Sequence, residues 1–358
     1  MERYLKIIIV MILSTVMSCS STNDSVVPTQ NSKKINLMNI FYDNKNLGDL
    51  TKQNNWDEIS PIETGTLSSI STSDDGQKIL VSAKNGKVYL SNNYGQTWEE
   101  KQSTRNWIAT AMNENGSIML LADRGSSIYL SGDHGSTWET QGITNAINSN
   151  WTALGIAKKA NTIIALEKEG QIYKYNGTHF NNVTNESKNW TDLTITGLHN
   201  LIFAVAYNDK IYKSTDSGST FKNITNESKN WNTISMSFNG NKIVAGENPG
   251  KLWYSNNTGE SWYEIKPDGD NNLNWETVSI SEDGDKIIAG TDNKRVYLSE
   301  DSGKTWVEMQ PLGNSDKIWI SSIILDINKI YLGIENGSIY QYSKKGIIIE
   351  NTNSSLIK

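Results

Sequence analysis

Residues 274–308 read NWETVSISEDGDKIIAGTDNKRVYLSEDSGKTWVE, and this stretch decides the fold. Residues 275–281 alternate between apolar and polar side chains, and Asp283-Gly284 then supplies the residues of a tight hairpin turn. Three further strand-like segments follow before residue 308, separated by polar turns. The stretch therefore predicts a four-stranded antiparallel meander. The chain shows no helical 3.6-residue apolar period with caps, which favours an all-β protein.

The same unit repeats along the chain. Its first-strand Trp recurs at intervals of 44, 39, 41, 44 and 44 residues, and two copies share the string Asn-Glu-Ser-Lys-Asn-Trp. A repeat of about 40 residues with four strands is one blade of a β-propeller. The repeated positions are Trp107, Trp151, Trp190, Trp231, Trp275 and Trp319, with Leu67 in the corresponding place of the first unit. We therefore expect a seven-bladed β-propeller.

Closure of the ring depends on one Trp that precedes the first unit. Trp56 is in register as the fourth strand of a blade but has no blade of its own. We therefore expect residues 53–60 to complete blade seven, so that an N-terminal strand closes the ring and leaves no open edge. In the alternative closure, residues 347–350 form that outer strand themselves.

A second motif, Ser-x-Asp-x-Gly-x-Thr-Trp, marks the turn between the third and fourth strands. Its five recognisable copies centre on Asn93, Asp133, Asp216, Asn257 and Asp301. An Asp or Asn at this place accepts backbone N–H bonds, and the Gly takes a positive φ. Because two copies carry Asn, which cannot replace a catalytic or metal-binding carboxylate, we interpret these residues as structural.

This motif resembles the Asp-box of the BNR-repeat propellers. Over residues 53–345 the repeat also looks like that of the photosystem-assembly-factor propellers and, more distantly, the sortilin ectodomain. These families bind proteins or peptides without chemistry, so the resemblance implies a recognition protein with no catalytic residues. Sialidases share the Asp-box and bind a carboxylate with three arginines, which leaves a glycoside hydrolase as the alternative. The chain has no Arg-Ile-Pro motif, however, and sialidases have six blades.

Strand direction predicts which residues share a face of the ring. In a meander the first strands begin on the face that also carries the second-to-third-strand turns, and we call it the Trp face. Arg105, Arg124 and Arg295 map to this face with the six repeated Trp residues. These nine residues are the candidate ligand-binding set. The indoles either pack between blades or are exposed platforms for a sugar ring or an aromatic side chain.

Carboxylates also map near the turns of the Trp face, but their spacing nominates no catalytic pair. They are Asp123, Glu169, Asp209, Asp292 and Glu335.

The N-terminal residues predict export and lipidation. Arg3 and Lys6 precede an apolar run over residues 7–16, which has the length of a signal-peptide core. The sequence Val-Met-Ser-Cys that ends at Cys19 resembles a bacterial lipobox. We therefore expect a signal peptide at 1–18, a lipidated Cys19 with a polar tether over 19–52, the propeller over 53–350 and a tail over 351–358. The expected location is the bacterial cell envelope, at the outer membrane or cell surface.

Composition excludes several classes of partner. The formal charge is −6 and the basic residues are scattered, so nucleic acid is not expected to bind. The single Cys excludes an intramolecular disulfide, and His134, His179 and His199 lack zinc-type spacing, so neither a metal nor a cofactor is expected. We thus expect a monomeric, membrane-anchored propeller that binds a protein or glycan through the Trp face.

Overall fold

A computed structural model describes residues 56–63, 65–125, 127–143, 150–158, 162–197, 201–292, 295–309, 311–312, 317–326 and 329–342. The chain divides into two compact units, and all of these residues belong to the second, Asp49–Lys358. The predicted signal peptide, Cys19, the tether, residues 347–350 and the C-terminal tail lie outside the described residues.

Within each blade the described residues form antiparallel β-structure with short turns, as the period-two alternation predicts. The strands of the first half are β1 (Trp56–Glu58), β2 (Thr66–Thr72), β3 (Ile79–Ser91), β4 (Glu99–Met112), β5 (Met119–Asp123), β6 (Ile128–Ser131), β7 (Glu139–Ile143), β8 (Trp151–Ile156), β9 (Ile163–Gly170), β10 (Ile172–Tyr175), β11 (His179–Asn182), β12 (Lys188–Ile195) and β13 (Ile202–Asp209). Those of the second half are β14 (Ile211–Ser214), β15 (Lys222–Asn223), β16 (Lys229–Met236), β17 (Ile243–Glu247), β18 (Leu252–Ser255), β19 (Tyr263–Ile265), β20 (Trp275–Ile280), β21 (Ile287–Thr291), β22 (Val296–Ser299), β23 (Val307–Met309), β24 (Trp319–Asp326), β25 (Lys329–Ile334) and β26 (Ile339–Tyr342).

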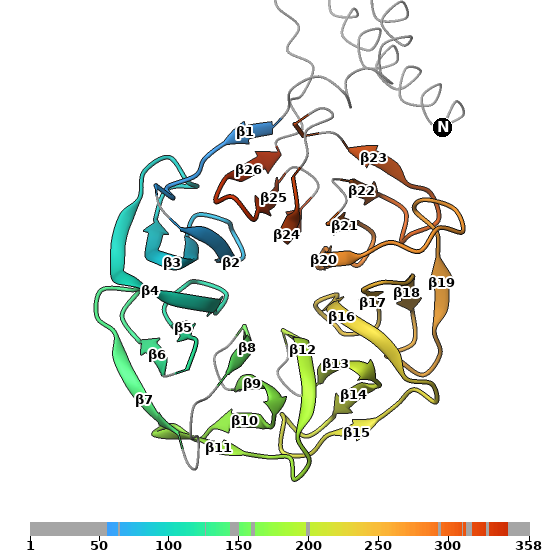
Figure 1. Cartoon of the computed structure of the whole chain (residues 1–358), viewed down its shortest axis with the longest axis horizontal. Helices are drawn as coiled ribbons and strands as arrows, with labels where there is room; N and C mark the ends of the chain where they lie inside the picture. Colours follow the sequence, from blue (N-terminus) through green and yellow to red (C-terminus); the bar gives the residue numbers. More distant parts are fainter. Residues whose placement is uncertain are drawn as a thin grey trace, which may run out of the picture. The chain divides into compact units, whose positions relative to one another are not determined.

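These strands form seven four-stranded blades around a common centre (Figure 1). In blade one, β3 supplies both the second and the third strand, and β4 runs on from the outer strand of blade one to the inner strand of blade two. Blades three to six are β8–β11, β12–β15, β16–β19 and β20–β23. The predicted all-β, seven-bladed propeller is therefore confirmed.

Blade seven is closed by the N-terminal strand. Its inner strands are β24, β25 and β26, and β1 pairs antiparallel with β26 through Trp56↔Tyr342 and Glu58↔Tyr340. The amide of Ile59 donates to the carbonyl of Ile339 at 2.9 Å and continues this pairing. The closure predicted from Trp56 is thus confirmed, because β1 occupies the edge of β26 that residues 347–350 would have needed.

The core is divided among the junctions between blades. Seven hydrophobic clusters of described residues each combine side chains from two neighbouring blades. The cluster between blades seven and one contains Leu67, Val81 and Tyr331, with Ile59 and Ile62 packed against it. Each sheet therefore buries both faces, and its stability depends on both neighbours.

The five repeated turns share one hydrogen-bond pattern. In the copy at Asp133, Oδ1 accepts the amide of Thr137 at 2.8 Å and Oδ2 accepts its hydroxyl at 2.7 Å. Donation by the backbone and side chain of Thr137 lowers the pKa of Asp133 to about 2. In the copy at Asn93, Oδ1 still accepts the amide of Thr97, while Nδ2 donates to the hydroxyl of Thr97 at 2.8 Å.

The turn therefore tolerates Asp or Asn because a hydroxyl can donate or accept. This supports the structural role predicted for Asn93, Asp133, Asp216, Asn257 and Asp301. The Gly after each of these residues has φ near +80°, as predicted.

Candidate functional site

The six repeated Trp side chains are buried. Their exposed fractions are 0–2%, and each lies in a cluster between neighbouring blades. An indole in this position cannot stack on a ligand. The prediction that Trp107, Trp151, Trp190, Trp231, Trp275 and Trp319 contact a ligand is therefore wrong, and the alternative that they pack between blades is confirmed. The physical reason is the large apolar area that a buried indole removes from water.

Each of these indoles meets an aromatic ring from the third strand of its own blade. The ring centroids are 5.0–6.4 Å apart and the planes cross at 62–77°, an edge-to-face geometry. The partner is Tyr in five blades and Trp253 in blade five. The sequence carries this signal as an aliphatic residue followed by Tyr or Trp at the start of each third strand, which the sequence interpretation missed.

Arg105 and Asp123 lie together on the Trp face of blade two. The guanidinium of Arg105 is 3.4 Å from Asp123 Oδ2 and 5.4 Å from the ring centroid of Tyr129. The Arg105 side chain is 44% exposed, whereas that of Asp123 is 6% exposed. Arg124 is exposed, and its backbone amide donates to Asn106 O at 2.9 Å. Both arginines are therefore accessible from solvent.

Arg295 is held by a separate set of partners on blade six. Its guanidinium is 2.9 Å from Asp268 Oδ1, 3.1 Å from the hydroxyl of Tyr297 and 3.9 Å from Glu308 Oε1. Hydrogen bonding to Tyr297, with the nearby carboxylates, raises the pKa of Arg295. Arg295 thus has its own local partners on blade six, whereas Arg105 and Arg124 belong to blade two.

Two lysines repeat the arrangement of Arg105 and were missed in the sequence. Nζ of Lys188 is 5.1 Å from the ring centroid of Tyr212 and 3.2 Å from Asp209 Oδ2. Burial alone would lower the pKa of Lys188, but hydrogen bonds to Tyr212, Glu186 and Asp209 outweigh it and raise that pKa. Lys229 lies in the same way over Trp253, at 4.5 Å. Arg105, Lys188 and Lys229 therefore each lie over a third-strand aromatic ring.

The residue after each first-strand Trp, and after Leu67 in blade one, is bulged out of the sheet. The ladder between first and second strands skips Ser68, Ile108, Thr152, Thr191, Asn232, Glu276 and Ile320. β-Bulges commonly redirect a side chain. Three of these side chains donate to a backbone carbonyl of the next blade: Thr152 Oγ1 to Thr191 O at 3.5 Å, Thr191 Oγ1 to Trp231 O at 3.0 Å and Asn232 Nδ2 to Trp275 O at 2.9 Å.

Glu276 is the ionisable member of this bulge set. Its Oε1 accepts a 2.6 Å hydrogen bond from Asn248 Nδ2. Burial raises the pKa of Glu276, and the charges of Asp292 and Glu335 raise it further, against the opposing effect of the Asn248 bond. Alignment of the repeats at the position after the Trp would have found it, because the other members are Ser, Ile, Thr and Asn.

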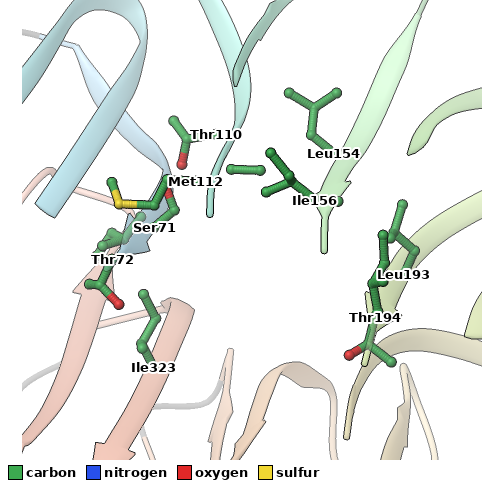
Figure 2. A pocket seen from close by; sticks show the side chains of 13 residues that line it. Ser71, Thr72, Thr110, Met112, Leu154, Ile156, Leu193, Thr194 and Ile323 are labelled. Atoms are coloured by element: carbon green, nitrogen blue, oxygen red, sulfur yellow. The ribbon is translucent and has the colours of Figure 1, made fainter. Parts of the chain in front are cut away.

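A cavity of about 290 Å³ lies among the inner strands of blades one to four and seven. Figure 2 shows its labelled side chains, which come from β2, β4, β8, β12 and β24 and surround a common opening. Its walls combine aliphatic side chains with hydroxyl groups such as those of Thr110 and Thr194. None of the described residues that line it is ionisable, so its wall holds no acid–base pair.

Side chains from four blades meet among the first-to-second-strand turns, on the face opposite the Trp face. Lys158 of blade three forms ion pairs with Asp74 of blade one, at 2.8 Å, and with Glu282 of blade six. Its Nζ also lies 5.1 Å from the ring centroid of Phe238 of blade five. Burial raises the pKa of Asp74, although the bond to Lys158 opposes that rise. These contacts fix turns from well-separated blades to one another.

Within the described ranges, no group of three or more His, Cys, Asp or Glu side chains is placed to hold a metal ion. No helix among the described residues is long and apolar enough to cross a membrane.

Comparison with known proteins identifies similar propellers. A family model described as "Sortilin, neurotensin receptor 3" matches residues 209–331, from the end of β13 to β25. The solved structure "YCF48 bound to D1 peptide" has 16% sequence identity and a TM-score of 0.65, covering 82% of this chain and 96% of that one. For "YCF48 from Cyanidioschyzon merolae" the values are 15%, 0.65, 80% and 98%. A search of curated proteins returned no match.

At these identities the similarity to YCF48 is one of fold. It covers nearly the whole of each YCF48 chain, so the likeness includes the full ring rather than a few blades. The part of the prediction that concerns a β-propeller is therefore confirmed.

Proposed function

We propose that this chain is a membrane-anchored, non-catalytic propeller that binds a segment of a partner protein on its Trp face. A propeller of the same fold has been solved with a peptide, as the name "YCF48 bound to D1 peptide" states. The anchor is the predicted lipid at Cys19, followed by the polar tether. The ring then acts as a rigid platform, because all seven blade junctions, including the closing one, are packed.

The observation that carries this proposal is the separation of charge on the Trp face. Blade two presents the exposed Arg105 and Arg124. Glu276 of blade six lies within electrostatic reach of Asp292 and Glu335, and the raised pKa of Glu276 reflects the cost of charging it there. Blades two and six are separated by at least two other blades in either direction around the ring (Figure 1).

This distribution favours a protein segment over a neutral glycan at this face. A polypeptide can place a carboxylate against the blade-two arginines and an ammonium or guanidinium group near Glu276, whereas a neutral sugar carries neither charge. Such complementarity fixes orientation and speeds association more than it adds affinity. The binding residues that we propose are therefore Arg105, Arg124 and Glu276, with Arg295 held by its ion pairs at the side of blade six.

The proposal can be tested by site-specific photocrosslinking in cells that express the full chain. A photoreactive residue at Arg124 is expected to crosslink a discrete polypeptide, and Glu276→Gln combined with Arg105→Glu is expected to reduce that product at least tenfold. The matched control places the photoreactive residue at Ser136, which is exposed on the opposite face. Equal crosslinking from both positions, or no effect of the charge changes, would contradict binding at the Trp face.

A glycoside hydrolase is the second candidate function. It gains one observation, because a half-buried carboxyl with raised pKa beside other carboxylates suits a general acid, and Glu276 has this character. Turnover of fluorogenic sialosides or glucans that disappears in Glu276→Gln, Arg124→Ala or Arg295→Ala would support the hydrolase and refute the non-catalytic proposal. Binding without turnover supports the recognition platform.

A further inference from the structure

A second cavity lies at the junction of blades four and five, beside Lys229 and apart from Arg105, Arg124 and Glu276. Its volume is about 290 Å³. One side is the connection that leaves blade four, and the other is the third strand and following turn of blade five. Its lining includes Asn226, Glu227, Lys229, Trp253, Glu260 and Trp262.

Three indoles form the apolar wall of this pocket. The ring centroid of Trp231 is 6.4 Å from that of Trp253 and 6.5 Å from that of Trp262. Trp231 is buried, whereas Trp253 and Trp262 are half-buried. The two outer indoles therefore present apolar surface next to the polar groups of the other lining residues.

The neighbouring junction provides an internal comparison. Residues 184–190 and 225–231 have the same sequence, Thr-Asn-Glu-Ser-Lys-Asn-Trp. Tyr212 and Phe221 of blade four pack beside Trp190, at the end of the first copy. Trp253 and Trp262 of blade five pack beside Trp231, at the end of the second copy. Ser219 likewise corresponds to Glu260. The two loops thus have the same sequence, but the second one faces two indoles and a carboxylate where the first faces Tyr, Phe and Ser.

The charges around the pocket distinguish between ligand classes. Nζ of Lys229 lies 4.5 Å from the ring centroid of Trp253, 3.7 Å from Glu247 Oε1 and 3.9 Å from Glu227 Oε2. An organic cation in the pocket would be repelled by this tethered ammonium. Glu227 and Glu260 are exposed and would repel an anionic ligand.

A neutral sugar carries no charge and is repelled neither by Lys229 nor by the two carboxylates. A pyranose ring has an apolar C–H face that packs on an indole and hydroxyls that bond to carboxylates and amides, as in sites that combine aromatic walls with few polar groups. The volume, at the lower end of the range for small-ligand sites, suits one ring. We propose that the pocket at the blade-four to blade-five junction binds one pyranose unit of a neutral glycan, with Trp253 and Trp262 as apolar walls and Asn226, Glu227 and Glu260 as hydroxyl partners.

Saturation-transfer NMR tests this site with the full chain carrying Cys19→Ser, which removes the predicted lipidation position. The probes are methyl β-D-glucopyranoside, methyl β-D-galactopyranoside and methyl α-D-mannopyranoside, each at 10 mM, with choline as the cationic probe. At least one glycoside is expected to receive saturation at its ring protons. Trp253→Tyr combined with Trp262→Phe, which installs the residues of blade four, is expected to reduce that signal at least fivefold.

Two further variants separate loss of the site from loss of the fold. Glu260→Ser changes an exposed side chain to the blade-four residue and is expected to weaken glycoside binding about threefold or more. Phe221→Leu alters the neighbouring junction and is expected to leave binding unchanged. The proposal is overturned if no glycoside receives saturation, if choline alone does, or if the Trp253→Tyr/Trp262→Phe protein binds as well as the unchanged one. These results are independent of crosslinking at Arg124, so either proposal can fail alone.

Discussion

Combined replacement of Trp56 and Ile59 by Ala tests whether the ring depends on its N-terminal strand. The two side chains stabilise different junctions. Trp56 packs against the cluster between blades six and seven, with its ring centroid 5.0 Å from that of Tyr342. Ile59 packs against the cluster between blades seven and one, and its backbone carbonyl accepts a 2.9 Å bond from Trp98 Nε1.

The magnitude follows from the burial of these side chains. Truncation of a fully buried Trp costs about 3–5 kcal/mol, so the half-buried Trp56 is expected to cost ~2 kcal/mol. The half-buried Ile59 is expected to cost ~1–2 kcal/mol. Because the two contact different clusters, the losses should add to ~3–4 kcal/mol. For a domain of this size that corresponds to a fall in Tm of about 6–10 °C.

Differential scanning calorimetry gives the change in Tm, and hydrogen exchange followed by mass spectrometry locates it. Faster exchange is expected first in β26 and in the strands of blade one. The matched control is Val307→Ala, an outer-strand residue of blade six that is 48% exposed and should change stability by less than about 0.5 kcal/mol. A Tm within about 2 °C of the unchanged protein, or faster exchange spread evenly over all blades, would refute closure by β1.

Two other predictions concern blade four. Trp190→Ala removes a buried indole, its edge contact with Tyr212 and its bond to Gly170 O. Chemical denaturation should therefore show that the free energy of unfolding falls by about 3–5 kcal/mol. A fall below about 1 kcal/mol would contradict the packing role. Burial raises the pKa of Asp192 to about 6, against bonds from Ile234, Leu193 and Thr233 that oppose the rise. The folded state therefore binds the proton more tightly than the unfolded state. The free energy of unfolding should fall by up to ~3 kcal/mol as the pH rises from about 4 to 6. Asp192→Ser should remove this part of the pH dependence in urea denaturation at pH 4–7.5, and an unchanged slope would exclude Asp192 as its source.

Much of the fold could be predicted because the repeat is written along the chain. Each Trp marks a first strand, and the spacing of Trp56 identified a fourth strand without a blade. The Asn copies of the turn motif indicated a structural role, which agrees with the bonds of Asn93 and Asp133. These features depend on local hydrogen bonds and on alternation of side chains, which one chain segment determines by itself.

The candidate site was less accessible from sequence. A first-strand Trp can face a neighbouring blade or the solvent, and the alternation is the same in both cases. The third-strand ring that covers each Trp was also overlooked, so Trp253 had no assigned role until its 6.4 Å contact with Trp231 placed it. Glu276 was missed because its raised pKa arises from burial, from Asp292 at the end of the next strand of its own blade and from Glu335 of blade seven.

The sequence by itself determined the number of blades, the meander within each, the repeated turns and the strand that closes the ring. Tertiary structure decided which indoles are buried, where charge is separated on the Trp face and which junction keeps an open pocket. It also brought Lys158 together with Asp74 and Glu282, residues from blades three, one and six. The reason is physical: periodicity and turn chemistry act between near neighbours in the chain, whereas burial and electrostatics act between surfaces that become neighbours when the ring closes.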